Sequence, residues 1–207
     1  MPGAHSTREL RMIDTEFCIS VLPGLFFRRS FMSRKNRKNE GSRNMKEIFE
    51  RVSIRKYTDQ PVEEEKILAI LRAAMAAPSA GNQQPWEFFV VQERGMLEAL
   101  AAVSPYSGCT KAAPLAIVSA YREKLWAPAY AQIDMSIAME NLWLACTEQG
   151  LGGVWLGIAP IEERMKAVEE IVGIPEGLRA FAVFPLGYPA EKRAQQDRFD
   201  EGRIHFL

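Results

Sequence analysis

The sequence predicts a mixed α and β sandwich, either α/β or α+β, from three observations. Short apolar runs bounded by turn residues, typical of strands, are interspersed with longer segments of helical periodicity. The chain has 207 residues, of which 47% are hydrophobic, as expected for one medium-sized globular domain. It contains neither a Gly-x-Gly-x-x-Gly sequence nor a Walker loop, so a doubly wound dinucleotide-binding fold has no fingerprint here.

The helices are expected where apolar residues recur every three or four positions. The helix over 63–76 is the clearest, because Pro61 and three consecutive glutamates mark its start and Pro78 marks its end. The helix over 129–149 is apolar almost all round, as expected of a buried central helix. A short helix over 45–51 is expected to turn Ile48 and Phe49 inward. The other helices are expected at 96–103 and 161–172, and the strands at 87–92, 115–120, 154–156 and 179–186.

The first 44 residues are expected to form a disordered, basic N-terminal extension, with the folded domain spanning 45–207. They contain nine Lys and Arg against four Asp and Glu, whereas the remainder holds 17 basic and 22 acidic residues. The apolar run from Phe17 to Phe27 is too short to span a bilayer, so no membrane partner is expected. A basic tail that binds nucleic acid is the alternative interpretation, and no recognised binding fold supports it.

Cysteine and histidine usage argues against several kinds of chemistry. Cys18, Cys109 and Cys146 are far apart, with no Cys-x-x-Cys pair, so neither a metal site nor a disulfide framework is expected. This usage favours a reducing, cytoplasmic location. The two histidines, His5 and His205, lie outside the patterned segments. Acid–base catalysis by histidine is therefore not expected.

Two polar segments are the candidates for ligand binding. Arg51, Ser53 and Arg55 lie at alternate positions of an extended stretch, so all three can point to one side and hold a phosphate group. Asn82 and Gln84 lie in a loop just before a strand, where their amides suit the hydrogen-bonding edge of a flat ring. The alternatives are a solvated basic surface for the first segment and ordinary turn residues for the second.

Residues 45–207 resemble the nitroreductase superfamily throughout. The resemblance rests on four segments that occur in family order: Arg51-x-Ser53-x-Arg55-x-Tyr57, Ala77-Pro78-Ser79-x-x-Asn82-x-Gln84-Pro85-Trp86, Gly150-Leu151-Gly152-Gly153-Val154-Trp155-Leu156-Gly157, and Gly187-Tyr188-Pro189 followed by Arg198. The resemblance implies an α+β, nitroreductase-like sandwich, with a central, mostly antiparallel sheet flanked by helices. It also implies an intertwined homodimer with FMN at the subunit interface.

The same resemblance implies a set of site residues. Phosphate binding falls to Arg51, Ser53 and Arg198, and Arg55 would lie near the N1/O2 side of the flavin ring. The backbone of 155–157 would pack on the ring and supply the N–H near N5. The full set of expected FMN contacts is Arg51, Ser53, Arg55, Pro78, Ser79, Asn82, Gln84, Trp155, Leu156, Gly157 and Arg198, some of them from the partner subunit. Substrate contacts are expected from Tyr106, Lys111, Trp126 and Tyr130.

The resemblance further implies an FMN-dependent NAD(P)H oxidoreductase that reduces electron-poor acceptors, such as nitroaromatics or quinones, by ping-pong hydride transfer through flavin N5. No side chain is expected to be catalytic, because the flavin carries the chemistry. Two alternatives remain: a flavin sensor or storage protein without turnover, and a flavin-destroying enzyme of the same fold. An iodotyrosine-dehalogenating activity is disfavoured because the segment 103–114 is short. The acceptor, and the choice between NADH and NADPH, are left open.

Overall fold

The computed structural model describes residues 45–207, and the expected extension over 1–44 lies outside them. In this part of the chain the sheet has five strands in the order β1-β2-β5-β3, with β4 also paired to β5, and every pairing is antiparallel. The expected α+β sandwich with a mostly antiparallel sheet is therefore confirmed. The strands are β1 (Trp86–Val91), β2 (Leu115–Arg122), β3 (Gly152–Gly153), β4 (Leu156–Gly157) and β5 (Leu178–Gly187).

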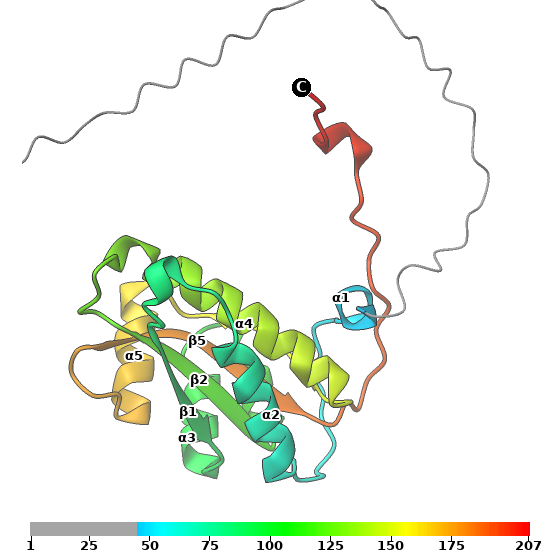
Figure 1. Cartoon of the computed structure of the whole chain (residues 1–207). Coiled ribbons are helices and arrows are strands. Elements are labelled where there is room, and N and C mark those ends of the chain that lie inside the picture. Colours follow the sequence, from blue (N-terminus) through cyan, green and yellow to red (C-terminus); the bar gives the residue numbers. More distant parts are fainter. Residues whose placement is uncertain (1–44) are drawn as a thin grey trace, which may run out of the picture. The chain divides into compact units, whose positions relative to one another are not determined.

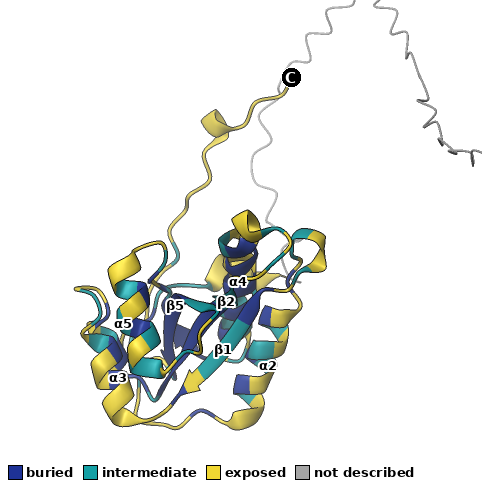
Figure 2. Ribbon diagram, turned by 90° about the vertical axis from the view of Figure 1, so that its left-hand side faces the viewer, coloured by how far each residue is buried: buried dark blue, intermediate teal, exposed yellow. Residues whose placement is uncertain are grey.

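The sheet lies between two pairs of helices, which Figure 2 shows on either side of the strands. Helices α2 (Glu64–Met75) and α4 (Ala131–Glu148) cover one face, and α3 (Arg94–Ala101) and α5 (Glu162–Val172) cover the other. Strand β2 shows how the sequence produces two cores. Leu115 and Ile117 point into the first core, whereas Ala116 and Val118 point into the second, because successive side chains of a strand alternate between faces.

Two expectations about buried helices are wrong for the single chain. The short helix α1 (Lys46–Glu50) buries none of its residues, and Phe49 is 60% exposed rather than turned inward. Helix α4, the long helix through the middle of Figure 1, buries one side against the sheet but leaves Ile133 and Ile137 55% and 38% exposed. The apolar pattern predicted burial correctly for the sheet-facing side, and it leaves a second apolar side uncovered within this chain.

The side of β5 opposite β2 carries the irregular backbone that shapes the candidate site. The expected strand over 154–156 is instead two short strands, β3 and β4, which pair with successive stretches of β5. Ile54 of the basic segment packs directly on β3, where a Cβ added at Gly152 would lie 2.6 Å from the Ile54 side chain. Only glycine allows this close approach. Among the helices of residues 45–207, none has the length and hydropathy needed to cross a membrane.

Candidate functional site

A cationic cavity of about 170 Å³ lies beside the basic segment. It brings together the predicted phosphate residues Arg51, Ser53 and Arg55 with Arg198, which lies more than 140 positions later in the chain. Arg193 of the C-terminal segment is a further cation in its wall. Several arginines and a hydroxyl around a small polar cavity are suited to a phosphate group.

Backbone contacts fix the basic segment against the edge of the sheet. The N–H of Ile54 donates to the carbonyl of Gly153 at 2.9 Å, and Ser53 forms an isolated bridge with the same glycine. The hydroxyl of Tyr57 lies 2.8 Å from the Ile54 carbonyl and 3.1 Å from that of Pro185. Burial raises the pKa of Tyr57 well above its usual value, so the hydroxyl stays protonated and able to donate.

Helix α4 holds the side chain of Arg51 in place. The Arg51 guanidinium lies 4.0 Å from the ring centroid of Trp143, in cation–π geometry, and 3.6 Å from the carboxylate of Glu140. Only 14% of the Arg51 side chain is exposed. Arg51 is therefore presented to the cavity from a packed position, in contrast to a freely solvated surface arginine.

Arg55 stands where two cavities meet. Its backbone N–H donates to the carboxylate of Glu191 at 2.6 Å, and this hydrogen bond is the largest influence that lowers the pKa of Glu191. The residue lines the cationic cavity and also a second, larger cavity of about 520 Å³. The second cavity is lined by Arg55, Ser104, Tyr106, Val154, Trp155, Leu156, Gly157 and Arg164.

Three consecutive residues, Trp155, Leu156 and Gly157, form one part of the wall of the larger cavity. The ring of Trp155 packs against Phe181 with centroids 5.7 Å apart and joins the core between the sheet and α4. Gly157 has no side chain, and a Cβ added there would meet nothing within 4 Å. The Trp155 side chain therefore packs into the core, and Gly157 adds no side chain to the cavity. This part of the wall leaves room for a flat ring.

The loop over 78–84 is held together by Asp134 of α4. This buried carboxylate accepts the N–H of Ala80 at 2.9 Å and the side-chain amide of Gln83 at 2.7 Å. The backbone N–H of Gln84 donates to the hydroxyl of Ser79 at 3.0 Å. Asp134 therefore acts as a structural hydrogen bonder between α4 and this loop.

The exposed amides of this loop are held in a strained backbone. Asn82 and Gln84 have φ angles of 59° and 47°, and the Gln84 amide donates to the Asn82 side chain at 2.9 Å. Left-handed backbone at residues other than glycine costs about 1–3 kcal/mol each and concentrates at functional sites. Trp126 packs over Gly81 so closely that a Cβ there would lie 2.0 Å from its ring.

Within the single chain, the basic segment and the 78–84 loop lie at opposite ends of the sheet, and Leu156 and Gly157 pair with the middle of β5. Trp86, which follows the 78–84 loop, pairs with Tyr121 and through it with Arg179 at the start of β5. Gly153, beside the basic segment, pairs with Leu186 at the end of β5. The seven residue steps from Arg179 to Leu186 correspond to about 23 Å of strand. Pro78, Ser79, Asn82 and Gln84 line neither of the two cavities described above.

The expected substrate residues divide in the same way. Tyr106 lines the larger cavity and is 75% exposed. Lys111 is exposed on the turn after it and lines neither cavity. Trp126 and Tyr130 lie with the 78–84 loop, to which Ala127 is fastened by two hydrogen bonds with the Gln83 side chain.

Sequence reasoning missed several residues that line the cavities, among them Arg193, Ser104 and Arg164. The position of Arg193 could have pointed to it, because it follows the Gly187-Tyr188-Pro189 turn in the same charged C-terminal tail as Arg198. Arg203 of that tail pairs with Asp200 at 3.0 Å, as a surface ion pair. Ser104 and Arg164 lie in stretches without a motif, and only the fold brings them to the cavity.

Thiol and metal chemistry receive no support from the described residues. Burial raises the pKa of both Cys109 and Cys146, which disfavours their thiolate forms. Within residues 45–207, no group of three or more His, Cys, Asp or Glu side chains is arranged to hold a metal ion.

Comparisons with known proteins agree in family and fold. Residues 48–107 and 101–188 match the model of the Nitroreductase family. A protein of Methanothermobacter thermautotrophicus, provisionally named an NADH dehydrogenase/NAD(P)H nitroreductase, is 46% identical over 161 residues, covering 76% of this chain and 83% of that protein. A crystal structure of a provisionally named NADH oxidase from Clostridium acetobutylicum has 45% identity and a TM-score of 0.74, covering 77% and 97% of the two chains. An FMN-dependent nitroreductase from Clostridium difficile has 30% identity and a TM-score of 0.72, covering 77% and 96%.

Proposed function

This chain belongs to the nitroreductase family, and from that membership we propose that it is an FMN-dependent NAD(P)H oxidoreductase acting on electron-poor acceptors such as nitroaromatics or quinones. The observation that carries the proposal is the pair of cavities that meet at Arg55. One is small and lined by several arginines, and the other is larger and includes residues 155–157 in its wall. FMN has the same two parts, a phosphate and a flat ring.

The residues present fit this cofactor. Arg51, Ser53 and Arg198 offer the charge and hydroxyl that a phosphate needs, and Arg51 is already held by Trp143. Arg55, at the junction, is placed to offset negative charge on the pyrimidine side of a reduced ring. Gly157 leaves open space where a side chain would otherwise obstruct a flat ligand.

When bound, FMN supplies hydride acceptance from NAD(P)H and hydride donation to the acceptor at its N5 position. The chain supplies position and electrostatics. The backbone of Trp155, Leu156 and Gly157, which line the larger cavity, would support the ring and would offer N–H groups to it. If donor and acceptor bind in turn in this one cavity, the kinetics are expected to be ping-pong.

We also propose that a second copy completes each site. The loop with Pro78, Ser79, Asn82 and Gln84 lines neither cavity of its own chain, so its amides would reach a ring in the larger cavity most simply from another subunit. The uncovered apolar side chains of α4 and α1 support such an association. Trp126 and Tyr130 would arrive with the loop, opposite Tyr106 and Lys111.

The proposal is tested by the absorption spectrum of the purified protein, before and after anaerobic addition of NAD(P)H. Flavin absorption that bleaches, and returns with a quinone or a nitroaromatic, supports the oxidoreductase. Bound flavin that does not bleach supports the sensor or storage alternative. Flavin that is consumed in oxygen points to the flavin-destroying alternative. Failure to hold or take up FMN would overturn the proposal.

A further inference from the structure

The larger cavity contains one cation with no assigned role. Arg164, on the first turn of α5, lines this cavity together with Arg55. Its Nη1 lies 3.4 Å from the carbonyl of Gly157, which turns the guanidinium toward the cavity wall. Within the described part of the chain, neither Arg55 nor Arg164 forms a side-chain ion pair with a carboxylate.

The charges around the cavity are unbalanced. Two arginines and no acidic residue are found among the described residues that line it. A volume of about 520 Å³ lies in the range of small-molecule sites. A cavity of one sign of charge attracts ligands of the opposite sign and selects against neutral ones.

The proposed cofactor accounts for the other cations but not for Arg164. Arg51 and Arg198 line the cavity proposed for the phosphate, and Arg55, which lines both cavities, would lie beside the pyrimidine side of a bound ring. Arg164 lies in the larger cavity alone and does not line the phosphate cavity. Its charge is therefore available to the second molecule that enters, the donor or the acceptor.

We propose that Arg164 is a specificity residue that binds an oxyanion group, carboxylate or phosphate, on the molecule that occupies this cavity beside the flavin. The inference rests on the proposed function and adds the substrate class: anionic rather than neutral redox partners. Arginine suits the role because its planar guanidinium can make two parallel hydrogen bonds to a carboxylate or phosphate. Tyr106, on the same cavity, can stack on an aromatic body attached to that anion.

The test compares wild type with Arg164→Gln, and with Lys166→Gln as the matched control. Lys166 is exposed on the same helix, carries the same charge and does not line the cavity. Two substrate pairs separate the sources of the anion. For the acceptor the pair is 4-nitrobenzoate and 4-nitrobenzamide. For the donor it is NADH and the phosphate-free 1-benzyl-1,4-dihydronicotinamide.

In Arg164→Gln we expect the kcat/KM ratio of anionic to neutral partner to fall about tenfold for one pair, because a charge-assisted hydrogen bond is lost. A fall for the nitrobenzoate pair assigns the anion to the acceptor, and a fall for the NADH pair assigns it to the donor. Lys166→Gln should leave both ratios unchanged. Two unchanged ratios, or an equal fall in Lys166→Gln, would overturn the inference.

A binding measurement tests the role of Arg164 in anion recognition without turnover. The dissociation constants of 4-methylbenzoate and 4-methylbenzamide are measured by calorimetry on the FMN-loaded protein, and wild type should prefer the anion. Arg164→Gln should lose that preference, and retention of it would contradict the inference. If the wild-type protein takes up no FMN, the proposed function fails, and the same titration without flavin still tests Arg164.

Discussion

At the scale of single residues, Arg55 connects the two cavities of the candidate site. A positive charge beside the pyrimidine side of a bound flavin stabilises the reduced, more negative ring. In Arg55→Ala we expect the two-electron midpoint potential to fall by about 30 mV, equivalent to about 1.4 kcal/mol. Lys56→Ala is the control, because Lys56 is exposed and lines neither cavity. Spectroelectrochemical titration checks this, and an unchanged potential in Arg55→Ala would refute the role.

Trp143 is expected to affect phosphate binding specifically, because its ring centroid lies 4.0 Å from the guanidinium of Arg51. Cation–π contacts of this kind contribute about 0.5–2 kcal/mol. We expect Trp143→Leu to weaken FMN binding about fivefold, within the range those energies allow. Binding of riboflavin, which lacks the phosphate, should change much less.

Titration with both flavins checks the prediction for Trp143. Trp143→Phe is the control, since it keeps an aromatic face under Arg51. In the background of Arg51→Gln, the substitution of Trp143 should have no further effect on the FMN-to-riboflavin ratio, because interacting residues are not additive. An equal loss for both flavins would mean that Trp143 acts only through general packing.

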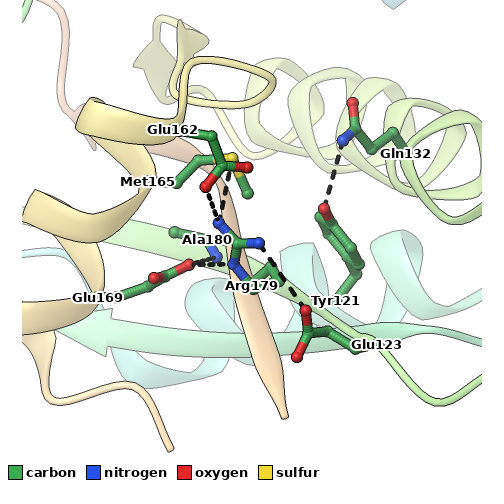
Figure 3. A network of polar contacts seen from close by, with 8 residues as sticks. All are labelled: Tyr121, Glu123, Gln132, Glu162, Met165, Glu169, Arg179 and Ala180. Atoms are coloured by element: carbon green, nitrogen blue, oxygen red, sulfur yellow. Dashed lines mark hydrogen bonds and ion pairs between the residues drawn. The ribbon is translucent and has the colours of Figure 1, made fainter. Parts of the chain in front are cut away.

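At the scale of elements, Arg179 joins three parts of the fold (Figure 3). From β5 its guanidinium contacts Glu162 at 2.6 Å and Glu169 at 3.0 Å, both on α5, and Glu123 after β2 at 3.8 Å. The hydrogen bonds that Arg179 donates to the carboxylates of Glu162 and Glu169 raise the pKa of Arg179. Helix α5 also carries Arg164, so this network helps to position the wall of the larger cavity.

We expect Arg179→Met to lower the free energy of unfolding by about 1–3 kcal/mol, the range for a hydrogen-bonded charge that is not fully buried. Urea unfolding measures this. Arg72→Met is the control, because Arg72 is exposed on α2 and surface substitutions usually stay within about 0.5 kcal/mol. A loss in Arg179→Met no larger than that of the control would contradict a structural role for the network.

Helix α3 gives a pH-dependent prediction. Its N-cap, Glu93, accepts the N–H groups of Gly95 and Met96, and these hydrogen bonds lower its pKa from the ordinary 4.5. A lowered pKa in the folded state adds stability above pH 4.5, and this stability is lost as the pH falls through the folded-state pKa. Glu93→Ala should therefore lower Tm at pH 7, and the difference from wild type should shrink toward pH 3.

Thermal scans at several pH values check the role of Glu93. The matched control is Glu98→Ala, on an exposed position of the same helix, which should not lower Tm at either pH. A difference between wild type and Glu93→Ala that stays constant down to pH 3 would show that the carboxylate charge is not what stabilises the helix.

At the scale of the whole molecule, the proposed two-copy site combines residues that lie apart in one chain. We expect a solution mass of twice the 23.3 kDa of the chain. Ile137→Glu, on the uncovered side of α4, should shift the protein toward monomer and weaken FMN binding at least tenfold, because a charge would be buried in an apolar contact. Light scattering and FMN titration measure the two effects.

Met96→Glu is the control for the association, since Met96 is 37% exposed, as against 38% for Ile137, but lies on α3 at the opposite face of the sheet. It should leave both mass and FMN affinity unchanged. A wild-type protein that is monomeric and still binds FMN tightly would contradict the two-copy site.

The sequence by itself determined what depends on local pattern. Alternating and helical periodicity predicted the layered fold, and the spacing of Arg51, Ser53 and Arg55 pointed to an anion site. Tertiary structure alone decided what depends on distant segments. It brought Arg193 and Arg198 to the basic segment and Arg164 to Gly157, and it left Asn82 and Gln84 at the far end of the sheet. The physical reason is that periodicity reports which side of an element is buried, whereas the identity of the residues that meet across a cavity follows from strand pairing and helix packing over the whole chain.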